Sequence, residues 1–181
     1  DEPLYGHYLK VSQASHPAQA ELVQKLDCDG ERVVQEVILG PCDRPVLFMK
    51  QMAHHLESLR WDFLSRTCNV LFIRDPRQML PSLVNQVRQP VLRDTGLAMQ
   101  TRLLKYLRSL GQDPPVMDSK ELLIDPKGVL QQLCDRIGIE FTEAMLEWSS
   151  GPKPEDGPWA PYWYHNAHRS TGFMPYQEKT Q

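Results

Sequence analysis

The chain has 181 residues, enough for one α/β domain with a substantial core, and its apolar runs are all too short to cross a membrane. The formal net charge of −3 gives no electrostatic reason to expect nucleic acid or an anionic membrane surface as a partner. Four scattered cysteines without a Cys-x-x-Cys pair indicate neither a zinc site nor a disulfide framework, and they favour a reducing, cytoplasmic setting. The first residue is Asp1, with neither an initiator Met nor a signal peptide, so we expect a fragment of a longer protein.

Along the chain, apolar runs that favour strands alternate with segments of helical period. The first ten residues predict a loop, and Ser15-His16-Pro17 begins a predicted helix. The predicted strands are Val33–Leu39, Val46–Met49, Val70–Ile73 and Pro115–Asp118. Further helices are predicted directly after Lys50, after Asp75, over Thr95–Leu110, after Asp125 and up to Trp148, before an irregular aromatic-rich loop over residues 151–181. This alternation is typical of a single three-layer α/β/α domain with a mostly parallel sheet, here residues 1–181, on which the final loop packs.

A strand that turns directly into a helix is the most informative stretch of the sequence. Val70–Ile73 predicts a strand buried on both faces, and Asp75 and Pro76 then give an N-cap and a first helical residue. Ligands bind at the carboxyl ends of strands in open α/β sheets, and free amides at a helix start favour an anion. Arg74 and Ser82 offer a guanidinium fork and a hydroxyl that suit a phosphate. The alternative is that Arg74 pairs with a carboxylate and Ser82 is a surface residue.

An Arg followed eight positions later by Ser, with Asp-Pro directly after the Arg, resembles the 3′-phosphate-binding motif of P-loop sulfotransferases. The run from Val116 through Asp125-Pro126 to Ile137-Gly138-Ile139 resembles the segment that ends the core of these proteins. The resemblance covers nearly the whole chain and is greatest to the sulfotransferase-like domain of bacterial proteins and of plant branched-chain-aminotransferase-like proteins. It implies a P-loop NTPase-like fold of the sulfotransferase type and the co-substrate 3′-phosphoadenosine 5′-phosphosulfate, without a metal. Arg74 and Ser82 then hold the 3′-phosphate of this donor.

Lys50 follows the predicted strand Val46–Met49, and His54 and His55 lie one turn further on. The resemblance assigns Lys50 to the donor and His54 to the proton of the acceptor. The chemistry suits both assignments, because His accepts protons near neutral pH and Lys stabilises charge on leaving oxygens. The spacing from Lys50 to His54 is wider than the Lys-x-His of the family, so the choice between His54 and His55 stays open. The alternative is an exposed histidine pair on a helix.

A late loop rich in Gly and Pro resembles the segment that closes over the 3′-phosphate and adenine of the donor in the family. The corresponding residues are Lys153, Gly157 and Trp159, although the Arg and the first Gly of the family pattern are out of place. The alternative is a surface tail whose aromatic residues pack on the core. His165 and His168 lie three residues apart without a third ligand at a suitable spacing, so the sequence predicts no metal site there.

The phosphate-binding loop that gives this superfamily its name is not found, since no Gly-x-x-x-x-Gly-Lys-Ser/Thr motif occurs in the sequence. We expect that loop and the first strand of the fold to precede Asp1 in a longer chain. The sequence then predicts transfer of a sulfuryl group to a hydroxyl or amine of a small-molecule acceptor. The main alternative is a catalytically inactive nucleotide-binding or interaction module of the same fold. A phosphotransferase is a third possibility, but no Walker-type Lys supports it.

Overall fold

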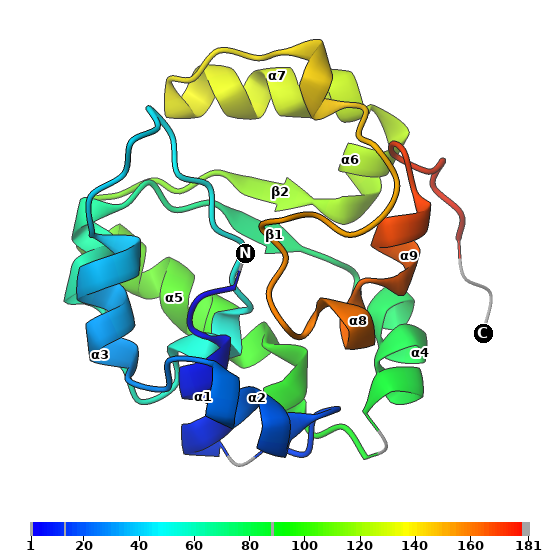
Figure 1. Cartoon of the computed structure of the whole chain (residues 1–181). Helices are drawn as coiled ribbons and strands as arrows, with labels where there is room; N and C mark the ends of the chain where they lie inside the picture. Colours follow the sequence, from blue (N-terminus) through cyan, green and yellow to red (C-terminus); the bar gives the residue numbers. More distant parts are fainter. Residues whose placement is uncertain (1, 13, 88, 179–181) are drawn as a thin grey trace.

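The computed structural model describes residues 2–12, 14–87 and 89–178, and it shows helices arranged around a small parallel sheet (Figure 1). The helices are α1 (Tyr5–Ser12), α2 (Gln19–Lys25), α3 (Gly30–Val33), α4 (Pro76–Gln86), α5 (Leu97–Ser109), α6 (Ser119–Ile124), α7 (Pro126–Ile137), α8 (Ala160–Trp163) and α9 (His165–Arg169). The strands are β1 (Leu71–Ile73) and β2 (Val116–Asp118). Short 3₁₀ turns cover Ala53–Leu56, Asp62–Arg66, Leu92–Thr95 and Glu143–Met145, and a π-helical turn covers Val34–Ile38.

The sheet confirms two of the predicted strands. β1 and β2 pair in parallel, with Leu71 opposite Val116 and Ile73 opposite Asp118, and α5 lies in the connection between them. In Figure 1, α7 lies above β2 and the helices α1 to α3 lie below β1. The α/β class is therefore correct. The described residues form only this two-stranded sheet, however, so the predicted three-layer architecture with a larger parallel sheet is not established. Phe72 in β1 is about half exposed, so the prediction of a strand buried on both faces is wrong for that face.

Helix ends follow the local chemistry of the sequence. The Asp75 carboxylate accepts a hydrogen bond from the Arg77 amide at 2.8 Å and caps α4, and Asp125 caps α7 in the same way through Gly128 at 2.9 Å. A proline follows each of these caps at the first helical position, where its missing N–H costs nothing. α4 continues past its internal proline to Gln86. Gly138 ends α7 with φ of 75°, a left-handed conformation that glycine adopts without strain.

Two predicted strands are wrong. Val33–Leu39 is helical, because the Asp29 carboxylate caps α3 through the Arg32 amide at 3.1 Å and the helical turn buries the adjacent valines in the core. Residues 46–49 form an irregular segment outside the sheet, and Phe48 is 75% exposed. An apolar run favours a strand only where a neighbouring strand offers hydrogen bonds, and among the described residues no strand pairs with this one.

The long helix expected after Lys50 is also wrong, since two short 3₁₀ turns replace it. Ser58 separates them with φ of 62°, a left-handed conformation that breaks the helical path of a non-glycine residue. The predicted loop at the start of the chain is instead helix α1, and the predicted final helix up to Trp148 is reduced to a 3₁₀ turn. The segment from residue 151 to residue 178 carries the short helices α8 and α9.

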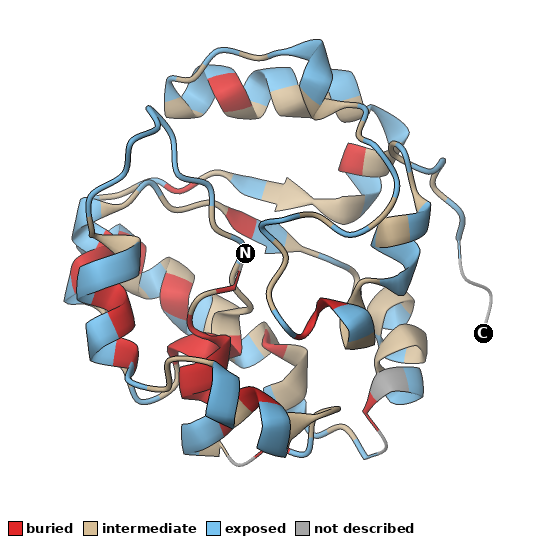
Figure 2. Ribbon diagram, in the orientation of Figure 1, coloured by how far each residue is buried: buried red, intermediate tan, exposed pale blue. Residues whose placement is uncertain are grey.

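Most of the buried hydrophobic residues form two clusters, which adjoin where Leu4 of one precedes Tyr5 of the other, the first residue of α1 (Figure 2). One cluster joins Leu4 to α3, β1 and α5, and its members are Leu4, Val33, Val34, Leu56, Phe63, Leu64, Leu71, Leu103 and Leu107. The other joins α1 and α2 to the C-terminal segment, and its members are Tyr5, Tyr8, Leu9, Ala14, Leu22 and Trp159. In the part of the chain that the structure describes, no helix has the length and apolar character required to cross a membrane.

Candidate functional site

Arg74 lies directly after β1 at the carboxyl edge of the sheet, and its side chain is exposed. Within the described ranges, its guanidinium makes no hydrogen bond and no ion pair. The nearby Asp75 carboxylate is instead bound by Arg77, with Nη2 at 2.7 Å from Oδ2. The alternative in which Arg74 pairs with a carboxylate is therefore not observed. Ser82 is half-buried two turns into the helix that follows.

The start of α4 differs from the expectation of free amides. The Arg77 amide donates to the Asp75 side chain, and the Gln78 and Met79 amides donate to the Asp75 carbonyl at 2.9 and 3.0 Å. Pro76 has no N–H. The first turn therefore has its donors satisfied, and an anion at this edge would depend on the Arg74 side chain rather than on the helix start.

Lys50 sits in a different environment from Arg74. Its ammonium forms an ion pair with the carboxylate of Glu2, whose side chain is only 7% exposed. The Tyr164 hydroxyl donates to Oε1 of the same carboxylate at 3.1 Å, and Nδ1 of His55 lies 3.8 Å from Oε2. The Lys50 side chain itself remains 52% exposed. Segments that are 48 and 162 residues apart from Glu2 in sequence thus converge on one carboxylate.

The two histidines that follow Lys50 are both buried, so the alternative of an exposed pair is wrong. His54 is only 4% exposed, and burial lowers its pKa from 6.5 to about 4. Burial also lowers the pKa of His55 well below its usual value, and the neighbouring His54 adds to that effect. Both imidazoles are therefore neutral near pH 7 and retain a nitrogen that can accept a proton. Nδ1 of His54 has no hydrogen-bond partner among the described residues, and its ring packs 4.7 Å from that of Tyr8.

The late Gly- and Pro-rich loop is held by its own contacts. The Lys153 ammonium donates to the Ser149 carbonyl and hydroxyl, and its backbone amide donates to Asp156, which also contacts Nε2 of His168 at 2.8 Å. A Cβ at Gly157 would lie 2.1 Å from the Trp159 indole, so only glycine leaves room for this ring. Trp159 is buried and meets Tyr5 edge to face at 5.5 Å.

The structure brings some of the predicted residues together. Trp159 Nε1 donates to the Tyr164 hydroxyl at 3.4 Å, and that hydroxyl reaches the Glu2 carboxylate beside Lys50 and His55. The late loop and the Lys50 segment therefore share one cluster. Arg74 has no hydrogen bond or ion pair to this cluster among the described residues. Groups of three or more His, Cys, Asp or Glu that could hold a metal are not found within the described residues.

A family model described as a sulfotransferase domain matches residues 1–179. The chain belongs to this sulfotransferase-domain family. It is 37% identical to "Branched-chain-amino-acid aminotransferase-like protein 2" of Arabidopsis thaliana, over 100% of this chain and 32% of that protein. It is 38% identical to "Branched-chain-amino-acid aminotransferase-like protein 1" of the same plant, over 96% of this chain and 31% of that protein. The chain thus spans about a third of the length of the curated relatives that it matches. No solved structure matches it.

The family match and both relatives confirm the resemblance that the sequence motifs indicated. Sequence reasoning nevertheless missed two residues that contact each other in the candidate site beside Lys50, Glu2 and Tyr164. Glu2 lies in a segment that was predicted to be a loop, and Tyr164 lies in one that was predicted to be irregular. No local signal marks their contact, because it joins positions 162 residues apart.

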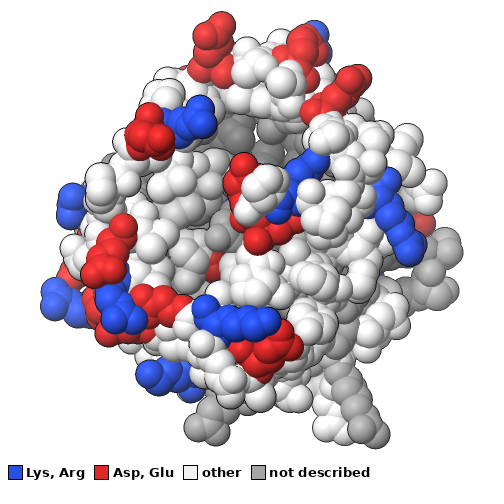
Figure 3. Space-filling model, in the orientation of Figure 1, with Lys and Arg blue, Asp and Glu red and all other residues white. Residues whose placement is uncertain are grey.

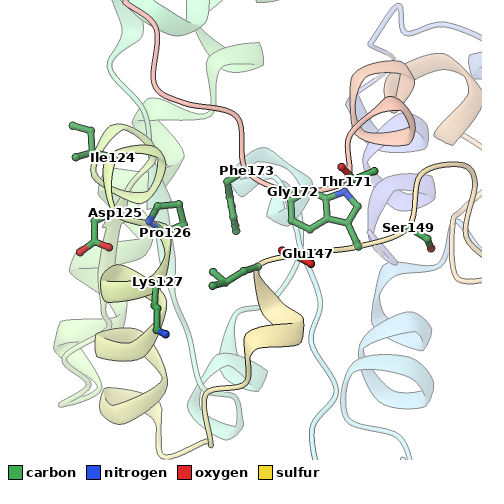
Figure 4. A pocket seen from close by; sticks show the side chains of 11 residues that line it. Ile124, Asp125, Pro126, Lys127, Glu147, Ser149, Thr171, Gly172 and Phe173 are labelled. Carbon is green, nitrogen blue, oxygen red and sulfur yellow. The ribbon is translucent and has the colours of Figure 1, made fainter.

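A groove of about 830 Å³ is lined by none of the predicted site residues, although Ser149 in its wall accepts hydrogen bonds from the Lys153 ammonium (Figure 4). Its walls are the junction of α6 and α7, residues 146–149 and residues 171–173, and Glu147 pairs with Gly172 across two of these segments. Figure 4 shows the Phe173 ring pointing between Pro126 and the segment that carries Glu147. On the face drawn in Figure 3, acidic and basic side chains intermix and the surface is hollowed below α7. This mixed charge does not single out a strongly charged ligand for the groove.

Proposed function

We propose that this domain binds 3′-phosphoadenosine 5′-phosphosulfate and transfers its sulfuryl group to a hydroxyl or amine of a small-molecule acceptor. The observation that carries the proposal is Arg74, an exposed guanidinium without a protein partner among the described residues, at the carboxyl end of a strand in a sulfotransferase-domain chain. An open Arg fork at such an edge favours a phosphate. Ser82, in the helix that follows, is proposed to bind the same 3′-phosphate.

The proposed reaction is an in-line displacement at sulfur. The acceptor oxygen or nitrogen bonds to sulfur, the bond from sulfur to the bridging phosphate oxygen breaks, and adenosine 3′,5′-bisphosphate leaves. Lys50 keeps half of its side chain in solvent and is proposed to donate to the oxygens that gain charge. His54 is neutral and is proposed to take the acceptor proton. Because His54 is 4% exposed, this role requires the surrounding cluster to open toward the acceptor.

Lys153, Gly157 and Trp159 are proposed to form the loop beside the nucleotide. Gly157 gives the Trp159 indole the space that it fills, and the Lys153 ammonium donates to the Ser149 carbonyl and hydroxyl. Trp159 is packed against Tyr5, so its ring supports the loop from inside rather than offering a free face for stacking on adenine.

The second candidate is a nucleotide-binding or interaction module of the same fold without catalytic activity. The burial of both histidines favours this candidate, because a proton acceptor without solvent access contributes nothing to turnover unless the cluster opens. Binding of the nucleotide alone does not separate the two candidates, whereas release of sulfate or of a sulfated product does.

The test is calorimetric titration of the full-length protein with adenosine 3′,5′-bisphosphate. We expect Arg74→Ala to weaken binding by about 1.5–3 kcal/mol, which is the size of a charged hydrogen bond and corresponds to about 10- to 150-fold in Kd. Arg77→Ala is the matched control, because this neighbouring Arg is exposed but bonded to Asp75, and it should change Kd less than about twofold. Equal affinity in the Arg74→Ala and wild-type proteins would show that the phosphate binds elsewhere.

A further inference from the structure

The carboxylate of Glu2 is the most enclosed acidic group in the candidate site. It lies at the centre of a cluster formed by Lys50 and His55, from one segment of the chain, and by Tyr164, from a distant one. Burying a carboxylate is costly unless it is paired and hydrogen-bonded, and Glu2 has both an ion pair and a hydroxyl donor. The fold therefore retains this charge in a place where an apolar residue would be easier to accommodate.

Lys50 and Lys25 show what the burial of Glu2 adds. Both lysine side chains are similarly exposed, at 52% and 56%, and both form an ion pair with a glutamate. The partner of Lys25 is Glu21, which is itself 50% exposed, so both groups of that pair can move in solvent. The partner of Lys50 is fixed inside the protein. A surface pair of the first kind contributes little and holds neither group in place, whereas a buried anchor fixes the position of the ammonium.

We propose that Glu2 is a positioning residue for Lys50, and that it holds one face of the ammonium so that the remaining N–H donors point outward to the donor nucleotide. The role toward the donor nucleotide rests on the proposed function, whereas the positioning of Lys50 rests on the ion pair with Glu2. A lysine ammonium has three donors, so one bond to Glu2 leaves two for phosphosulfate oxygens. Tyr164 donates to the same carboxylate and so fixes the anchor from the side of the late loop.

The anchor also changes what Lys50 offers to a ligand. Its positive charge is balanced by Glu2, so the charges of the bound donor before the reaction gain little from attraction to the ion pair. The oriented donors gain strength as charge develops on the leaving oxygens, which is the pattern expected of a group that favours the transition state. Replacing Glu2 by Gln removes the balancing charge, so we expect adenosine 3′,5′-bisphosphate to bind more tightly while kcat falls. A residue with only a structural role would lower the folded fraction without tightening nucleotide binding.

The first test is acylation of lysines by an amine-reactive reagent, followed by peptide mass spectrometry. In the native full-length protein we expect Lys50 to react about tenfold more slowly than Lys25, because its ammonium must first leave the buried carboxylate. Glu2→Gln should remove this protection, and Glu21→Gln, the matched control, should change the rate of Lys25 less than about twofold. Tyr164→Phe should increase the Lys50 rate by a smaller factor and covers the case in which Glu2→Gln fails to fold. Equal rates for Lys50 and Lys25 in the native protein would overturn the inference.

The second test separates this inference from the proposed function. Titration with adenosine 3′,5′-bisphosphate and sulfate release from the donor are measured for the wild-type and Glu2→Gln proteins. Tighter binding with slower release supports the positioning role. If the wild-type protein binds the nucleotide and Glu2→Gln changes neither its affinity nor the rate of sulfate release, the positioning role is overturned. A wild-type protein that binds no nucleotide contradicts the proposed function instead, and the acylation rates then still decide whether Glu2 holds Lys50.

Discussion

The strand end at Arg74 and the cluster around Glu2 hold their charged groups in opposite ways. Arg74 is exposed and makes no ion pair within the described residues, and it follows a strand whose place was evident from sequence. Lys50 is anchored on a buried carboxylate amid neutral histidines and tyrosines from distant segments. The first arrangement is suited to capture a ligand from solvent, and the second is suited to hold a group still. The proposed transfer reaction requires both arrangements, one at Arg74 and the other at Lys50.

The largest expected effect is on stability, in the buried region between α1 and the late loop. Trp159→Ala should lower the free energy of unfolding by about 3–5 kcal/mol, because the indole fills the cluster between α1 and the late loop and its loss leaves a cavity. Urea unfolding measures this change. Trp148→Ala is the control, since that ring is only half-buried beside Phe173 and should cost less. A loss below about 1 kcal/mol for Trp159→Ala would mean that the late loop detaches from the core easily.

The pH dependence of stability tests whether the histidines stay neutral and buried. The pKa of His54 is about 4 in the folded protein and 6.5 when exposed, so the unfolded chain binds a proton first as the pH falls. The stability from this group is therefore complete above about pH 6.5 and is lost progressively toward pH 4, by on the order of 3 kcal/mol in total. His55 shifts in the same direction and adds to the loss. Urea midpoints between about pH 7.5 and pH 5 measure the effect, and a flat profile would mean that the cluster is hydrated.

The smallest expected effect on stability is at the start of α4, next to Arg74. Asp75→Ala should lower the free energy of unfolding by about 1 kcal/mol, because it removes the side-chain cap of α4. Asp75→Asn keeps the cap and should cost much less, so the pair of variants isolates the hydrogen bond in thermal or urea unfolding. Neither substitution should alter acylation of Lys50. A change in that rate would show that the two regions are coupled.

Local sequence signals predicted the region around the strand end at Arg74 and failed for the buried cluster around Glu2. The cap at Asp75, the helix after Asp125 and the strands β1 and β2 are properties of neighbouring residues, and each is confirmed. Residues 33–39 and 46–49 are apolar runs whose structure depends on distant partners. The first run is helical, and the second is an exposed irregular segment.

The candidate site divides along the same line. The exposure of Arg74 at a strand end follows from the turn beside it, and the positions of Lys50 and His54 after an apolar run were evident as a motif. The burial of His54 and the anchor at Glu2 follow from α1, which was predicted to be a loop because its eight residues mix aromatic and polar side chains. Polar and aromatic residues that are mixed in this way form no clear amphipathic stripe at helical spacing that would reveal the helix.

The contact between α1 and the late loop has a consequence for how the domain acquires its structure. The Trp163 indole donates to the Tyr5 hydroxyl at 3.2 Å, and that hydroxyl also meets His16 at 2.9 Å, so two segments 158 residues apart in sequence share one packed cluster. Contacts of such separation are slow to form, because a long loop must close before they contribute. During synthesis on the ribosome, α1 emerges long before the residues that cover its aromatic face. Its tyrosines and Leu9 are therefore exposed to other chains and to chaperones until Trp159 and Trp163 arrive, and assembly of this cluster is a late event in folding.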